Sequence, residues 1–152
     1  MHHQNNMTMT SEERLRRHSA HYLPCFINEC EHHTTCLHWL TAQHTTENQL
    51  SIISVNPTNP EVSAGRCPVY RENKTVTYAK GLIHFLDEIP NREARHIKQR
   101  LISLFGRKYF YEYRNGSRLI APDVQQQIAR VCQEEGYNGP LHYDGWEEDY
   151  LW

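Results

Sequence analysis

The chain has 152 residues, a formal net charge of −2 and a mean hydropathy of −0.78. This length fits one domain, and a hydrophobic fraction of 38% leaves only a modest core. No apolar run is long enough to span a bilayer, and the polar residues 1–10 contain no signal peptide, so we expect a cytoplasmic protein with no membrane association.

Charge is unevenly distributed along the chain. Residues 92–118 hold eight Lys or Arg against two Glu, an excess of six positive charges. Residues 140–152 hold four acidic residues and no basic one. Such segregation is compatible with a partner-binding surface or with an acidic tail that docks on the basic segment.

The first half of the chain predicts short elements. Residues 1–10 are expected to be disordered, and Thr10 and Glu13 form a capping box that predicts a helix over 11–21. Apolar patterning further predicts a helix carrying Leu37 and Leu40, a buried strand at Leu50–Val55, a strand at Lys74–Ala79 and a short helix or turn at Gly81–Ile89.

The second half predicts a helix, a β-hairpin and a second helix. An apolar stripe that begins at Ala94 predicts a helix from Asn91 to Gly106. Lys108–Arg114 and Ser117–Ile120 resemble strands, and the Asn115-Gly116 pair between them predicts a two-residue type I′ turn. A final helix is expected from Pro122 to Gly136, with Cys132 as a core thiol on its apolar stripe.

Three cysteines, Cys25, Cys30 and Cys36, lie within twelve residues, and Cys67 follows before a proline. A tetrahedral Zn²⁺ takes four thiolates, or thiolates mixed with imidazoles, so we interpret these four residues as a structural zinc site. The two spacings, four and five residues, are longer than those of most zinc knuckles. The residues that can replace one cysteine are His32, His33 and His38.

Two other interpretations of the cysteines stay open. An iron–sulfur cluster also takes four thiolates, and the pair Cys67-Pro68 is compatible with one. Plain buried thiols or disulfides are the other interpretation, although a reducing cytoplasm and an odd count of five cysteines disfavour a full disulfide framework.

The sequence contains no motif that assigns a catalytic residue. Phosphate-loop, dinucleotide-binding, zinc-protease and nucleophile-elbow patterns are absent. A zinc deaminase needs Pro-Cys-x-x-Cys, whereas four residues separate Cys25 from Cys30. We therefore interpret the chain as a non-enzymatic binding module, with an iron–sulfur or metal-dependent enzyme as the alternative.

The basic segment supplies the candidate partner site. Tyrosines on one face of the expected hairpin can stack on bases, and nearby Arg and Lys can contact phosphates. Ordinary cross-strand packing and a solvated helix face explain the same residues without a partner. The candidate residues for binding nucleic acid or a protein are Arg95, Lys98, Tyr111, Tyr113, Arg114 and Arg118.

Several short motifs support a family resemblance. They are Pro24-Cys25-Phe26, Cys30, Cys36-Leu37, Cys67-Pro68-Val69-Tyr70-Arg71 and the tyrosine-rich Arg-Asn-Gly segment followed by Pro122 and Gln126. On these residues the chain resembles a domain-of-unknown-function family of short proteins from Bacteroidales, over roughly Tyr22 to Gly136. The resemblance implies a single bacterial domain and no established activity.

Together these observations predict a small α+β single domain over 1–152, with a Cys-rich metal-binding loop and a helix–β-hairpin–helix segment. Within it we expect a Cys-rich half at 22–79, a helix–hairpin–helix half at 80–136 and an acidic aromatic tail at 137–152.

Overall fold

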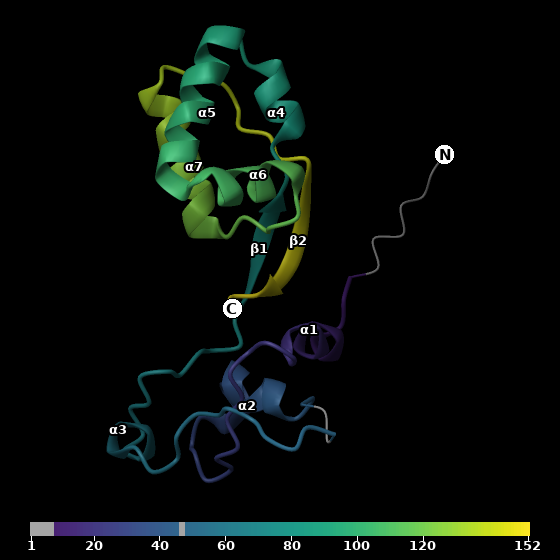
Figure 1. The fold of residues 1–152 in the computed structure, drawn as a ribbon, viewed down its shortest axis with the longest axis vertical. Coiled ribbons are helices and arrows are strands. Elements are labelled where there is room, and N and C mark those ends of the chain that lie inside the picture. The colour runs from purple at the N-terminus through teal and green to yellow at the C-terminus, as the bar shows by residue number, and fades with distance from the viewer. Residues whose placement is uncertain (1–7, 46–47) are drawn as a thin grey trace. The chain divides into compact units, whose positions relative to one another are not determined.

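The structure is a computed structural model that describes residues 8–45 and 48–152. Its α+β class agrees with the sequence-based prediction: the described residues form seven α-helices, one 3-10 helix and one two-stranded sheet. The chain divides into two compact units (Figure 1). Unit 1 comprises the chain up to Lys74 together with Tyr150–Trp152. Unit 2 is the segment between them, Thr75–Asp149. The single domain expected over 1–152 stays a prediction.

Unit 1 is built from short helices joined by long loops. Its elements are α1 (Ser11–His18), the 3-10 helix η1 (His33–Thr35), α2 (Leu37–Ala42) and α3 (Pro60–Ser63). A small core of Leu15, Leu37 and Tyr150 is packed against by the partly buried Tyr22, Leu40 and Trp152. Because this core is small, most of unit 1 depends on loops that are held by local hydrogen bonds.

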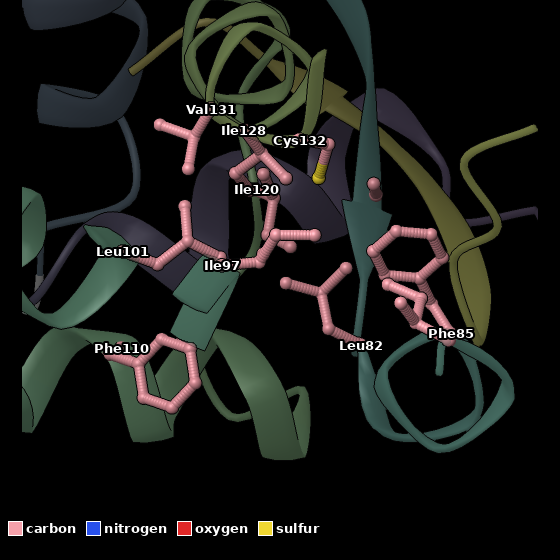
Figure 2. Packing of buried hydrophobic residues seen from close by; sticks show 11 residues of the cluster. Leu82, Phe85, Ile97, Leu101, Phe110, Ile120, Ile128, Val131 and Cys132 are labelled. Carbon is pink, nitrogen blue, oxygen red and sulfur yellow. The ribbon is translucent and has the colours of Figure 1, made fainter. Parts of the chain in front are cut away.

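Unit 2 contains the larger core. Its elements are β1 (Thr75–Lys80), α4 (Ile83–Glu88), α5 (Asn91–Phe105), α6 (Arg107–Asn115), α7 (Pro122–Glu134) and β2 (Gly145–Tyr150), of which the last residue, Tyr150, belongs to unit 1. The side chains of Ile97, Ile120 and Ile128 are fully buried and gather between the helices and the sheet (Figure 2). The core also includes Cys132, as the sequence predicts.

The two strands are antiparallel, and Asp144 lies at one end of the paired segment. The Asp144 N–H donates to the Gly81 carbonyl, whereas the Leu151 N–H donates to the Lys74 carbonyl. The Asp144 carboxylate then accepts from the Ile83 N–H at 2.9 Å and the His84 N–H at 3.2 Å, which are free donors at the start of α4.

The His84 ring also contacts this carboxylate. Nδ1 of His84 lies 2.7 Å from Oδ1 of Asp144. Burial favours the neutral acid, but donors from His84 and Ile83 outweigh it and hold the pKa of Asp144 below its ordinary value. The hydrogen bond to Asp144 raises the pKa of His84. One aspartate therefore links the sheet to the first turn of α4.

Several sequence-based predictions are confirmed. The Thr10 hydroxyl accepts from the Glu13 N–H, and the Glu13 carboxylate accepts from the Thr10 N–H, which completes the capping box of α1. The helix ends at His18, before the predicted residue 21. Helices α2, α4, α5 and α7 and strand β1 also form where the sequence predicts them. Of the expected disordered segment 1–10, residues 1–7 lie outside the described residues.

The predicted β-hairpin is wrong, because residues 107–115 form helix α6. Asn115 is the last residue of that helix, and Gly116 adopts φ 82° and ψ 6°, a left-handed cap. A type I′ turn needs positive φ at both turn residues, but no described residue other than glycine has positive φ. The Asn-Gly pair therefore ends a helix here, where the same glycine conformation is favoured.

The buried strand predicted at 50–55 is also wrong. This segment forms neither helix nor strand, and Leu50 and Ile53 are largely exposed. Only Val55 is buried, with its N–H donating to the Pro24 carbonyl. A strand pattern needs a neighbouring strand to pair with, and the described part of unit 1 provides none.

Candidate metal centre and candidate partner surface

The four predicted ligands line one small cavity in unit 1. Cys25, Cys30, Cys36 and Cys67 all contribute to its wall, and its volume is about 30 Å³. His32, His33 and His38 line it too, together with apolar side chains that include Ile27, Trp39 and Val55. The structure thus brings the four cysteines to one place, although Cys67 is distant in sequence.

An isolated antiparallel bridge brings the Cys67 segment to Cys36. Cys36 and Glu72 form this bridge. On its two sides the Leu37 N–H donates to the Arg71 carbonyl at 2.8 Å, and the Asn73 N–H donates to the Thr35 carbonyl at 2.9 Å.

A turn then leads from this bridge back to the cysteine. The Tyr70 N–H donates to the Cys67 carbonyl at 3.1 Å. The Tyr70 hydroxyl lies 3.0 Å from the hydroxyl of Thr35. These contacts hold the segment that contains Cys67 beside the cavity.

Other contacts hold the loop that contains Cys25 and Cys30. The Cys25 N–H donates to the His38 carbonyl at 2.9 Å, and the indole N–H of Trp39 donates to Oδ1 of Asn28 at 2.9 Å. The loop is therefore attached to helix α2 at two points.

The thiols of the cavity cysteines and of Cys132 have different surroundings, which affect their pKa values. Burial raises the pKa of the Cys25 thiol, a backbone hydrogen bond from Ile27 lowers it, and the nearby Cys36, Cys30 and Cys67 raise it further. Repulsion of this kind arises between negatively charged thiolates that lie close together. Burial in the unit 2 core raises the pKa of Cys132 to about 11, so that thiol stays protonated at neutral pH.

The cysteine side chains are not arranged as a finished coordination sphere. Within residues 8–45 and 48–152, no group of three or more His, Cys, Asp or Glu side chains is placed to hold a metal ion. The five cysteines are free thiols.

The six candidate partner-binding residues lie on α5, on α6 and in the segment that follows α6. Arg118 is paired with Glu112, Nε to Oε2 at 2.7 Å, and its guanidinium lies 4.3 Å from the Tyr109 ring centroid. Tyr113 is partly buried and packs edge-on against Phe105. Both side chains therefore already make intramolecular contacts.

The remaining candidates lie on helices α5 and α6. Arg95 is exposed on α5, and Lys98 lies 5.6 Å from the ring centroid of the partly buried Tyr111. Arg114 is half-buried near the end of α6. Arg95 and Arg114 form no ion pair with any described residue, whereas Arg100 on α5 is paired with Glu134 and Glu135.

Sequence reasoning missed the partners of these charges. Glu112 pairs with Arg118 because the chain turns back after the end of α6, where the Arg118 N–H donates to the Glu112 carbonyl, whereas the sequence suggested a hairpin here. Glu134 and Glu135 reach Arg100 because α5 packs on α7. A helical assignment of residues 107–115 would have placed Lys108 and Glu112 one turn apart, which was the available signal.

The chain belongs to a family of unknown function, DUF6078, whose model matches residues 7–152. Neither the curated proteins nor the solved structures contain a match to this chain. No described helix has both the length and the apolar character needed to cross a membrane.

Proposed function

We propose that this chain is a non-enzymatic binding module of the bacterial cytoplasm, in which zinc bound by Cys25, Cys30, Cys36 and Cys67 stabilises unit 1. The observation that supports the proposal is the single small cavity lined by all four cysteines. A unit with a core as small as that of unit 1 gains stability from a metal that cross-links its loops.

The size and lining of the cavity favour a single ion. A volume of about 30 Å³ suits one ion or one water molecule. An iron–sulfur cluster contains several metal and sulfide atoms and is therefore larger than a single ion. Thiolate ligands with apolar surroundings suit Zn²⁺, which has no geometric preference of its own and takes tetrahedral sulfur sites.

The first prediction concerns metal content. Protein purified without chelator should hold about one Zn²⁺ per chain, because a closed four-ligand site takes one ion. Cys67→Ser should remove most of that zinc, since a hydroxyl is a far weaker zinc ligand than a thiolate. Elemental analysis by mass spectrometry measures both values.

Cys132→Ala provides the matched control. Cys132 lies in the core of unit 2 and does not line the cavity, so its loss should leave the zinc content unchanged. A parent chain that contains no zinc, and takes up none when incubated with it, would contradict the proposal. Iron together with visible absorption would support the cluster instead.

The partner of the module is proposed to be a nucleic acid or a protein that contacts helices α5 and α6. Support comes from Arg95 and Arg114, whose charges are not neutralised by any described acidic side chain. The exposed Arg92, one turn before Arg95, extends the same basic region along α5. The tight pairs at Arg100 and Arg118 limit this region to fewer charges than the sequence indicated.

The second prediction tests the nucleic-acid partner. Each phosphate contact contributes about 0.9 to the slope of log K against log salt on duplex DNA. Replacing Arg95 and Arg114 together by alanine should therefore reduce this slope by about 1.8. Fluorescence anisotropy over a range of salt concentrations measures it.

Arg100→Ala is the control, because its charge is already paired with Glu134 and Glu135. This variant should keep the parental slope. If the parent chain does not bind DNA or RNA even at low salt, the nucleic-acid partner is excluded and the protein partner is retained.

A further inference from the structure

Two histidines beside the four cysteines are held in a defined orientation. Nδ1 of His38 lies 2.6 Å from the carbonyl oxygen of Leu23, and Nδ1 of His33 lies 2.7 Å from the carbonyl oxygen of Cys30. A carbonyl oxygen can only accept a hydrogen bond, so each Nδ1 carries a proton and donates it. Both histidines line the cavity that the cysteines share.

The backbone of each histidine binds a second cysteine segment. The Cys25 N–H donates to the His38 carbonyl at 2.9 Å, so His38 contacts the chain at Cys25 and at Leu23, two residues earlier. The Cys36 N–H donates to the His33 carbonyl at 3.2 Å, so His33 connects Cys30 with Cys36. Together the two histidines tie down three of the four cysteine-bearing segments.

Ring packing further restricts both imidazoles. His38 stacks on Tyr22 with a centroid distance of 4.6 Å, and His33 meets Trp39 edge-on at 4.6 Å. His32 also lies near an aromatic ring, that of Tyr70, at a centroid distance of 5.5 Å, but it is exposed and its ring forms no hydrogen bond to any described residue. His142, an exposed histidine of unit 2 that does not line the cavity, serves as the comparison for the other two.

We propose that His38 and His33 are positioning residues of a metal site in this cavity. Their Nδ1–H groups fix the backbone around Cys25, Cys30 and Cys36, so that four sulfurs can converge on one thiophilic divalent cation. This inference rests on the proposed zinc site and adds to it the residues that determine its affinity. Outer contacts of this kind typically change metal affinity by about 10–100-fold.

Amide side chains can separate positioning from metal ligation. His38→Asn keeps an N–H donor close to the place of Nδ1, whereas His38→Gln places its amide near the position of Nε2 and loses the bond to Leu23. Titration of the full-length chain with Co²⁺, a coloured substitute for Zn²⁺, reports affinity. The intensity of the sulfur-to-cobalt absorption reports how many thiolates bind.

We expect His38→Asn to bind Co²⁺ nearly as tightly as the parent and His38→Gln to bind it about 10–100-fold more weakly. Both should keep the absorption of four thiolates. His33→Asn and His33→Gln should repeat this difference, and His142→Asn and His142→Gln should both bind like the parent. Circular dichroism of each variant without metal confirms that it is folded.

Two results would overturn the positioning role. If His38→Asn weakens binding as much as His38→Gln and the absorption loses a sulfur or nitrogen ligand, His38 is itself a ligand. Equal, parental affinity of both variants would show that the bond to Leu23 is dispensable. If the parent binds no Co²⁺ at all, the proposed zinc site fails first, and that outcome is distinct from both.

Discussion

Phe110→Ala should destabilise unit 2 by about 3–5 kcal/mol, because the ring is only 1% exposed and its removal leaves a cavity in the core. Phe110 lies on α6, which packs against α5 and β1. Amide hydrogen exchange of peptides from α5 and α7 should accelerate by two to four orders of magnitude, since each 1.4 kcal/mol corresponds to about tenfold.

Leu104→Ala is the control for this prediction. Leu104 lies on α5 but is 50% exposed, so its truncation should change stability by about 0.5 kcal/mol or less. If the two variants exchange at the same rate, the assignment of Phe110 to the core is incorrect. The comparison therefore tests helix α6, the element that differs most from the sequence-based prediction.

Gly81→Ala should destabilise unit 2 by about 3–5 kcal/mol in total. Gly81 has φ +81°, and a Cβ there would lie within 3.1 Å of three atoms of the Asp144 side chain. Accommodating it would pull the carboxylate away from the N–H groups of Ile83 and His84, which leaves the start of α4 uncapped. Urea unfolding followed by circular dichroism measures the loss.

Gly136→Ala separates backbone strain from this contact. Gly136 has φ +86°, but a Cβ there would meet nothing within 4 Å. It should cost only the left-handed strain of about 1–2 kcal/mol. Equal losses for the two variants would show that Asp144 adjusts freely and that its link to α4 is weak.

Local signals predicted much of this fold because they depend on neighbouring residues. The capping box at Thr10 needs only Glu13 three residues away, and Pro122 at the first position of α7 needs no partner at all. The apolar stripe of α5 is similarly local. Such elements can be recognised from the sequence because the residues that define them are close together along the chain.

The errors arose where one pattern suits two structures. Tyr109, Tyr111 and Tyr113 alternate as in a strand, yet only the burial of Phe110 against α5 and β1 decides in favour of a helix. Asn115-Gly116 fits both a hairpin turn and a helix end, because each uses a glycine with positive φ.

Only part of the candidate metal site could be predicted from the sequence. Three cysteines close in sequence predict a shared loop, but the arrival of Cys67 depends on the bridge between Cys36 and Glu72. Nothing in the residue types signals that bridge. Likewise, the sequence named three histidines as equivalent, and only the ring hydrogen bonds of His33 and His38 distinguish them from His32.

The return of the chain to unit 1 at Tyr150 gives the protein the architecture of a host with an insert. Residues 75–149 leave the host after Lys74 and rejoin it at Tyr150, and the Leu151 N–H donates to the Lys74 carbonyl at 2.9 Å. The two junctions are therefore adjacent on the host. Adjacent junctions are what allow one folding unit to be spliced into another without stretching it. Tyr150 of the host core, and Trp152 that packs against it, follow the insert in the sequence.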